Sequence, residues 1–223
     1  MLYVVPTPIG NLGDMTLRAL QVLQTVDVVL AENPRHSSKL LRHYQIKTKV
    51  LAYHQHNEHR LATSLVRRMI GGERMALISD AGTPCISDAG YLLVRHCIEA
   101  GVSVSCLPGA TAFVPALVMS GLPAHEFLFC GFLPSKKGRR QRLQQLAQEP
   151  RTLILYEAPH RLLHLLEDLV CYFGAERQVC LCREISKVHE QAIRMKAAEA
   201  YQWAAAQQLR GEWVIVVAGA EKS

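Results

Sequence analysis

Short apolar runs alternate with longer segments of helical periodicity along the whole chain. The runs are rich in β-branched and aliphatic residues, and this pattern predicts strands at about 2–5, 26–31, 49–53, 75–79, 102–107, 127–131, 152–156, 178–183 and 213–218. Apolar positions at helical spacing predict helices near 14–24, 36–44, 58–70, 88–100, 110–120, 139–148, 159–172 and 196–209. Alternation of this kind is typical of an α/β fold with largely parallel sheets.

A hinge is predicted near the middle of the chain, at Gly121-Leu122-Pro123-Ala124. Gly and Pro interrupt the helical pattern there, and four or five strands fall on each side. We therefore expect two α/β domains, 1–120 and 121–223. A cleft between two such domains is the usual place for a ligand.

Composition is that of an ordinary globular protein, with 223 residues and 49% hydrophobic content. The apolar runs are too short to cross a bilayer, and the start, Met1–Pro6, lacks the basic segment of a signal peptide. The seven cysteines are scattered, mostly within apolar segments, and form no disulfide or zinc pattern. These features predict a cytoplasmic protein without a membrane span.

The net charge of +6 is modest, but its distribution is informative. Five cations lie within residues 136–142: Lys136, Lys137, Arg139, Arg140 and Arg142. One interpretation is a solvated helix start, as for most charge runs. Cations at a helix N-terminus oppose the macrodipole, however, so we favour contact with an anion such as a nucleic-acid phosphate.

Three Gly-containing loops each follow a predicted strand, at residues 6–14, 79–84 and 107–111. Such loops converge at one edge of a parallel sheet, which predicts a small-ligand site there. None of them is a GxGxxG fingerprint of dinucleotide binding. Asp80 could accept hydrogen bonds from an amine or a ribose, or form an Asx-turn. Asp88 could cap the following helix.

Six segments in sequence order carry a resemblance to a known family. They are Pro6-Thr7-Pro8-Ile9-Gly10-Asn11-Leu12-Gly13-Asp14, Ser79-Asp80-Ala81-Gly82-Thr83-Pro84, Gly131-Phe132-Leu133-Pro134, Tyr156-Glu157-Ala158-Pro159-His160-Arg161, Arg183-Glu184-Ile185-Ser186-Lys187 and Gly211-Glu212. Together they resemble the bacterial small-subunit rRNA (cytidine-2′-O)-methyltransferase family, within the tetrapyrrole methylase superfamily. The resemblance implies a two-domain α/β enzyme, usually a homodimer, that binds S-adenosyl-L-methionine in an interdomain cleft without metal. Its substrate would be ribosomal RNA or the small ribosomal subunit.

The resemblance also implies which residues contact the cofactor. Matched motif by motif, they are Pro8, Ile9, Asp80, Ala81, Gly82, Thr83, Ile86, Thr111, Ala112, Tyr156, Glu157 and Glu184. The sulfonium supplies a good leaving group, so alignment of the nucleophile with the methyl group can provide much of the rate.

A ribose hydroxyl is a weak acid, so a positioned base or a stabilised alkoxide would help its methylation. We predict Glu32, Arg35 and Lys187 as catalytic residues, with Glu184 and Glu190 as further candidates near Lys187. A structural salt bridge between Glu32 and Arg35 is an equal alternative.

The chain departs from the family at Asn33-Pro34, where relatives usually carry Asp-Thr. The change removes a carboxylate beside Glu32. The chain also ends soon after its last strand, whereas many relatives continue into a small helical domain, so a weaker grip on RNA or a different substrate is expected.

Histidines cluster in Tyr53-His54-Gln55-His56-Asn57-Glu58-His59. A metal site would need three converging ligands, so we favour a hydrogen-bonding patch that faces the substrate and expect no metal. Two other functions compete with RNA methylation. One is a small-molecule methyltransferase of the same fold, and the other is a non-catalytic RNA-binding or ribosome-assembly protein.

Overall fold

The computed structural model describes residues 1–220 and divides the chain into two compact units. The first unit runs from Met1 to Thr111, and the second begins at Ala112. The sequence places the division later, after residue 120. The difference concerns the helix α5 (Phe113–Ser120), which packs with the second unit. Its Phe113 ring lies 4.8 Å from that of Phe129, and its Ala116 carbonyl lies 3.8 Å from Cys182 Sγ.

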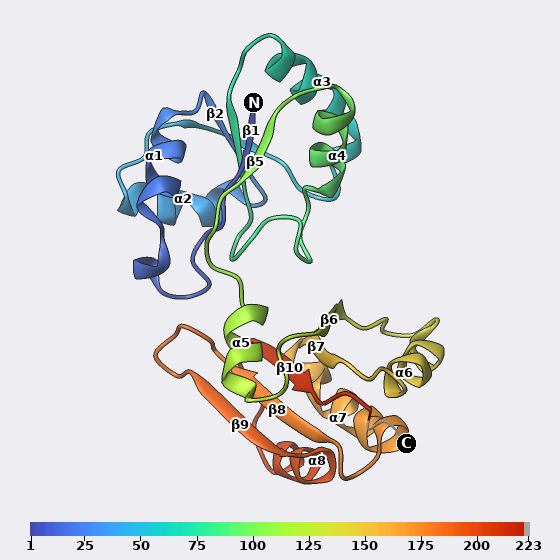
Figure 1. Ribbon diagram of the computed structural model, residues 1–223. Helices are drawn as coiled ribbons and strands as arrows, with labels where there is room; N and C mark the ends of the chain where they lie inside the picture. The colour runs from blue at the N-terminus through green and yellow to red at the C-terminus, as the bar shows by residue number, and fades with distance from the viewer. Residues whose placement is uncertain (221–223) are drawn as a thin grey trace. The chain divides into compact units, whose positions relative to one another are not determined.

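The first unit contains a five-stranded parallel sheet with the order β3-β2-β4-β1-β5; its helices α1 to α4 are labelled around the sheet in Figure 1. Its strands are β1 (Leu2–Val4), β2 (Val28–Ala31), β3 (Lys49–Ala52), β4 (Met75–Ile78) and β5 (Val104–Cys106). A short 3₁₀ turn, η1 (Leu12–Asp14), precedes α1 (Leu17–Thr25), α2 (Pro34–His43), α3 (Glu58–Ile70) and α4 (Tyr91–Glu99). The predicted parallel sheet is therefore confirmed for this unit.

Helices cover both faces of the first sheet, as its continuous apolar strands require. Successive residues of a strand point to opposite faces. Val28 and Leu30 of β2 accordingly pack with α3 and α4, whereas Val29 and Ala31 pack with α1 and α2. Helix α2 begins where Asn33 caps it, because the Asn33 side chain accepts hydrogen bonds from the Arg35 and His36 amides.

The second unit contains a mixed sheet with the order β6-β7-β10-β8-β9. Its strands are β6 (Phe127–Phe132), β7 (Thr152–Glu157), β8 (Gln178–Arg183), β9 (Gln191–Lys196) and β10 (Trp213–Val217). Helices α6 (Arg139–Ala147), α7 (Pro159–Phe173) and α8 (Ala197–Ala205) contribute to the apolar core on one face of the sheet. Helix α5 contacts the other face (Figure 1).

Two features of the second sheet differ from the prediction. Only β6 and β7 pair in parallel, so the expectation of a largely parallel sheet is wrong here. The apolar pattern also predicts no strand at 191–196, where β9 pairs with β8 at the edge of the sheet. An edge strand with charged Arg194 and Lys196 has little apolar signal, which is why periodicity misses it.

Candidate functional site

Three loops of the first unit meet at the carboxyl ends of β1, β4 and β5. The Thr7 and Gly82 backbones exchange two hydrogen bonds of 2.9 Å, which join the first loop to the second. The Thr83 hydroxyl donates to the Ala110 carbonyl at 3.0 Å, which joins the second loop to the third. The predicted convergence of these loops is therefore confirmed.

Glycine is required where these loops approach one another. Gly82 has φ +79°, in the left-handed region, and a Cβ there would lie 3.4 Å from the Ile9 side chain. A Cβ on Gly109 would lie 2.7 Å from Pro6 Cβ, closer than real side chains come. Gly82 is therefore needed for its backbone conformation, and Gly109 for the close approach of Pro6.

Asp80 is the polar group of these loops that best fits a bound nucleoside. Its Oδ1 atom is shielded from solvent and has no hydrogen-bond partner within residues 1–220. A shielded carboxylate oxygen without a partner is costly, and a ribose hydroxyl or an amine could donate to it. Pro8, Ile9 and Ile86 are half-buried and Ala81 is exposed. Thr111 is the last residue of the first unit, and Ala112 begins the second and caps α5.

Glu32 follows β2 at the same sheet edge and is half-buried. Burial raises the pKa of its carboxyl, and so does the charge of Asp80, whereas a hydrogen bond from the Asp80 backbone and the charge of His54 lower it. A carboxylate with a raised pKa is a stronger base. The predicted salt bridge from Glu32 to Arg35 is absent among the ion pairs of residues 1–220, and Arg35 is exposed on the first turn of α2.

Asp88 is a third carboxyl at this edge, and its role as a helix cap is wrong. Helix α4 begins three residues later, with Gly90 at its cap position. Burial and the charge of Glu32 raise the pKa of Asp88 to about 6, against a lowering hydrogen bond from Ser79. A signal for this residue exists in the sequence, because Ser79-Asp80-Ala81-Gly82 recurs as Ser87-Asp88-Ala89-Gly90.

Replacing Asp88 by Asn should raise the melting temperature at pH 8 by about 2–4 °C. The folded pKa of about 6 lies above the value near 3.9 of an unfolded Asp, so ionisation costs stability as pH rises through 6. Asn removes that charge, and the gain should shrink as pH falls from 8 towards 5. Calorimetry across this range would detect it. A gain independent of pH would contradict the assignment.

In the second unit, Lys187 joins two loops through two carboxylates. Its Nζ lies 3.0 Å from Glu184 Oε1 and 3.0 Å from Glu212 Oε2. Partial burial lowers the pKa of Lys187, but these two hydrogen bonds outweigh it and raise the pKa overall. Glu184 Oε1 also accepts from the Glu212 amide at 2.9 Å, and a Cβ on Gly211 would lie 2.8 Å from the Glu184 side chain. The Glu184–Lys187 turn is thus fixed against the segment that precedes β10.

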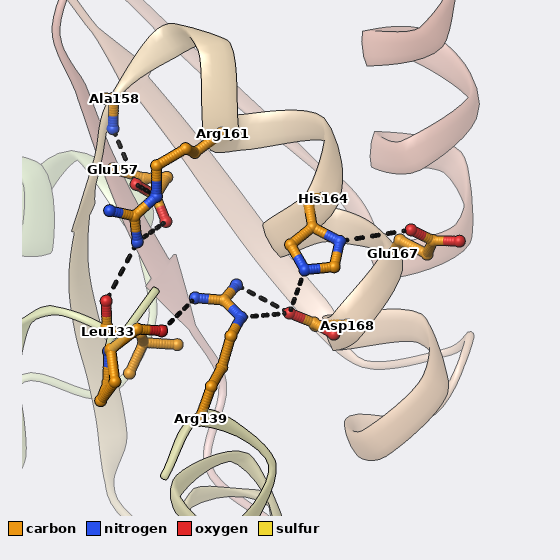
Figure 2. Close-up of polar contacts among 9 residues, drawn as sticks. Leu133, Arg139, Glu157, Ala158, Arg161, His164, Glu167 and Asp168 are labelled. Carbon is orange, nitrogen blue, oxygen red and sulfur yellow. Dashed lines mark hydrogen bonds and ion pairs between the residues drawn. The ribbon is translucent and has the colours of Figure 1, made fainter. Parts of the chain in front are cut away.

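Glu157 and Tyr156 end β7, and the structure gives them different surroundings. The Glu157 carboxylate is fully buried and accepts from the Ala158 amide at 2.9 Å and from Arg161 at 3.1 Å (Figure 2). The Glu157 carboxylate thus holds the start of α7 in place. Because it is buried and already paired, only the backbone of Glu157 is left to contact a cofactor. Tyr156 is half-buried, with its ring 5.1 Å from Phe129.

The basic segment at 136–142 is only partly exposed. Arg139 is buried and pairs with Asp168 at 2.7 Å, while also donating to the Pro134 carbonyl at 3.1 Å (Figure 2). The prediction that it contacts phosphate is therefore wrong. The sequence shows charge but not burial, which explains the error. Lys136, Lys137 and Arg140 are exposed.

The histidine cluster is held by its own loop. Asn57 Oδ1 accepts from the His54 amide at 2.9 Å, and the His54 and His56 rings are 5.8 Å apart. Within residues 1–220, no group of three or more His, Cys, Asp or Glu side chains is arranged to hold a metal. No helix in this part of the chain is long and apolar enough to span a membrane.

The fold and the loops define the chain as a tetrapyrrole methylase. Residues 1–201 match the family model of Tetrapyrrole (Corrin/Porphyrin) Methylases. Three solved structures share the fold at low sequence identity. The methyltransferase CobJ has a TM-score of 0.71 at 18% identity, covering 100% of this chain and 96% of that one. Diphthine synthase has 0.73 at 13%, covering 97% and 89%. The uroporphyrin-III C-methyltransferase of Thermus thermophilus, solved with S-adenosylhomocysteine, has 0.66 at 20%, covering 97% and 96%.

Curated relatives identify the family within the tetrapyrrole methylases to which the chain belongs. Proteins named ribosomal RNA small subunit methyltransferase I are 51% identical in Synechocystis, 50% in Vibrio cholerae and 51% in Pseudomonas aeruginosa. They cover 99%, 98% and 98% of this chain and 79%, 77% and 78% of their own length. The chain belongs to the ribosomal RNA small subunit methyltransferase I family. Membership confirms the predicted family, the two-domain α/β fold and an S-adenosylmethionine-dependent methyltransferase.

Proposed function

We propose that this protein transfers the methyl group of S-adenosylmethionine to a ribose 2′-hydroxyl of small-subunit ribosomal RNA, in the cytoplasm and as a homodimer. The proposal of an RNA substrate rests on about 50% sequence identity, over nearly the whole chain, to proteins named ribosomal RNA small subunit methyltransferase I. The ribose as acceptor rests on the resemblance of the motifs and on the carboxylate chemistry at the end of β2.

The loops of the first unit suit the cofactor. Within residues 1–220, Asp80 Oδ1 is a shielded acceptor without a partner, and Gly82 leaves the space beside Ile9 and Ala110 free of a side chain. We assign the nucleoside contact to Asp80 and the close backbone approach to Gly82 and Ala81. When bound, the cofactor supplies an activated methyl group on a positively charged sulfur.

Glu32 is the residue to which we assign the acceptor proton. Its raised pKa makes it a better base than an exposed glutamate, and it stands beside Asp80 at the sheet edge. Arg35, which forms no ion pair within residues 1–220, would balance the negative charge that develops on the ribose oxygen. Lys187 is already neutralised by Glu184 and Glu212, so we assign it to holding its loop in place.

Methyl transfer to purified bacterial small ribosomal subunits tests the proposal. Labelled S-adenosylmethionine and subunits from a strain that lacks the modification should give label at a single nucleotide. Resistance of that nucleotide to alkaline hydrolysis would identify the 2′-O position. Label on a base, or none on the RNA, would overturn the proposed acceptor.

Replacing Gly82 by Val should abolish cofactor binding, with at least a hundredfold rise in Kd. The side chain is strained at φ +79° and enters the space that we assign to the cofactor. Isothermal titration calorimetry would measure the loss. Gly72→Val is a matched control, because Gly72 also has a positive φ but has open space around it. Undiminished binding by a folded Gly82→Val protein would refute this placement.

A further inference from the structure

The segment from 33 to 57 contains no Asp or Glu. It carries five Lys or Arg residues, at 35, 39, 42, 47 and 49, and four histidines, at 36, 43, 54 and 56. Solvated protein surfaces usually intersperse both signs of charge. A stretch of this length without a carboxylate is therefore a cationic surface and not an ordinary solvated face.

Helix α2 presents three of these cations as one stripe. Arg35, Lys39 and Arg42 are spaced four and three residues apart, so they lie above one another on one face of the helix. All three are exposed, whereas Ser37 and Leu41 on the opposite face are buried. The stripe extends for about 10 Å along the helix.

Within residues 1–220, no carboxylate forms an ion pair with the stripe. Among the ion pairs of residues 1–220, none involves Arg35, Lys39, Arg42 or Lys47. By contrast, other arginines on helices of the same unit, Arg68 and Arg95, pair with glutamates. The positive field of α2 thus remains available for an external anion.

Helix stability does not explain the stripe. Arg35 and His36 occupy the first turn, which has no acidic residue, so cations stand where the macrodipole disfavours them. Arg42 is at the favourable end, but Lys39 in the middle gains nothing from the dipole. A phosphate at this surface would offset the unfavourable placement.

A hollow continues the cationic surface beyond the end of α2. It has a volume of about 450 Å³, and its lining combines apolar Leu41, Ile46 and Val50 with Arg42, Gln45 and Lys47. The Ser38 and Thr48 hydroxyls in the lining already donate to the backbone carbonyls of Arg35 and Leu23, so the cationic and amide groups are the donors left for a nucleic-acid phosphate. The opposite end of α2 begins two residues after Glu32. The surface therefore leads from the proposed acceptor carboxylate outward across the first unit.

We propose that helix α2 and the segment 44–48 bind the phosphate backbone of the RNA strand that carries the acceptor ribose. The inference rests on the proposed function and adds the surface that grips the substrate. Contacts of this kind fix position without reading sequence, and they make binding strongly dependent on salt. Lys39, Arg42 and Lys47 are the residues expected to contribute most to affinity without touching the reacting atoms.

The test uses the double variant Lys39→Glu/Arg42→Glu and purified bacterial small ribosomal subunits as the probe. At 150 mM salt its Kd for the subunit should rise at least tenfold, and the slope of log affinity against log salt should fall by about 1.5. The Kd for S-adenosylmethionine should not change, which also shows that the unit is folded. The neutral double variant Lys39→Gln/Arg42→Gln should also bind the subunit more weakly, with a smaller rise in Kd than the charge-reversal variant.

Arg60→Glu/Arg67→Glu on α3 is the matched control. These two arginines are also exposed and carry the same charge, but α3 packs on the opposite face of the first sheet. An equal loss in the control would show a general effect of net charge and overturn the assignment to α2. Unchanged affinity and slope in the α2 variant would overturn it directly. Failure of the parent protein to methylate the subunit would instead count against the proposed function.

Discussion

Replacing Glu32 by Gln is expected to lower the single-turnover rate of methyl transfer by about a hundredfold or more, the scale for loss of a positioned base. Gln retains the size and a hydrogen-bonding oxygen but cannot take up the acceptor proton. Position 33 is Asn, which cannot ionise, and Glu32 is the only acid between residues 28 and 57. Rapid quench with labelled cofactor and small subunits measures the rate.

The dependence on pH separates a base from a merely structural residue. Burial raises the pKa of Glu32, so the parent rate should rise with pH as this carboxyl ionises, and the Gln variant should lose that step. Glu99→Gln, at the end of α4, is a suitable control with little expected effect, because its side chain is exposed and lies outside the site. A Glu32→Gln rate within a few-fold of the parent would leave alignment and desolvation to explain catalysis.

Removing the Arg139 guanidinium should cost about 3–5 kcal/mol of unfolding free energy, since Asp168, with 14% of its side chain exposed, would keep only the longer contact with His164 at 3.8 Å. We suggest Arg139→Met, which keeps the length of the side chain. Both tryptophans, Trp203 and Trp213, lie in the second unit, so urea unfolding followed by their fluorescence reports on that unit alone.

Arg140→Met is the neighbouring control, because Arg140 is exposed and its loss should cost less than about 0.5 kcal/mol. Adding Asp168→Asn to Arg139→Met should recover part of the loss, as both charges are then gone. Equal unfolding free energies for Arg139→Met and Arg140→Met would contradict the inferred stabilising role of the Arg139–Asp168 ion pair. Tests of RNA binding by this segment should therefore change Lys136, Lys137 and Arg140 and leave Arg139 intact.

The first unit was easier to predict than the second for a physical reason. Parallel strands that are buried on both faces, such as Val28–Ala31 and Met75–Ile78, appear in a sequence as continuous apolar runs. Strand direction leaves no such mark, so the antiparallel pairing of β8 and β10 could not be foreseen. The edge strand β9 has too few buried positions to stand out.

The loops of the site were predictable because Gly and Pro mark them, and the structure joins them through Thr7, Gly82 and Thr83. The burial of the charged side chains and their hydrogen-bond partners could not be predicted in the same way. The sequence allows Asp88 as a helix cap and predicts Arg139 as a phosphate contact, because it shows the type of a charged group but not what surrounds it. The acid-free stretch around α2 was visible in the sequence as a missing residue type, which motif comparison overlooks.

The position of β1 in the first sheet has a consequence for synthesis of the chain. Residues 2–4 form a central strand that pairs with β4 on one side and β5 on the other. Strand β1 is synthesised before both of its partners, so it must wait until residues 75–78 and 104–106 have followed it out of the exit tunnel. At ordinary translation rates this delay lasts several seconds. A nascent chain stalled before residue 104 would expose an unfinished sheet edge, the kind of surface that chaperones and proteases act on.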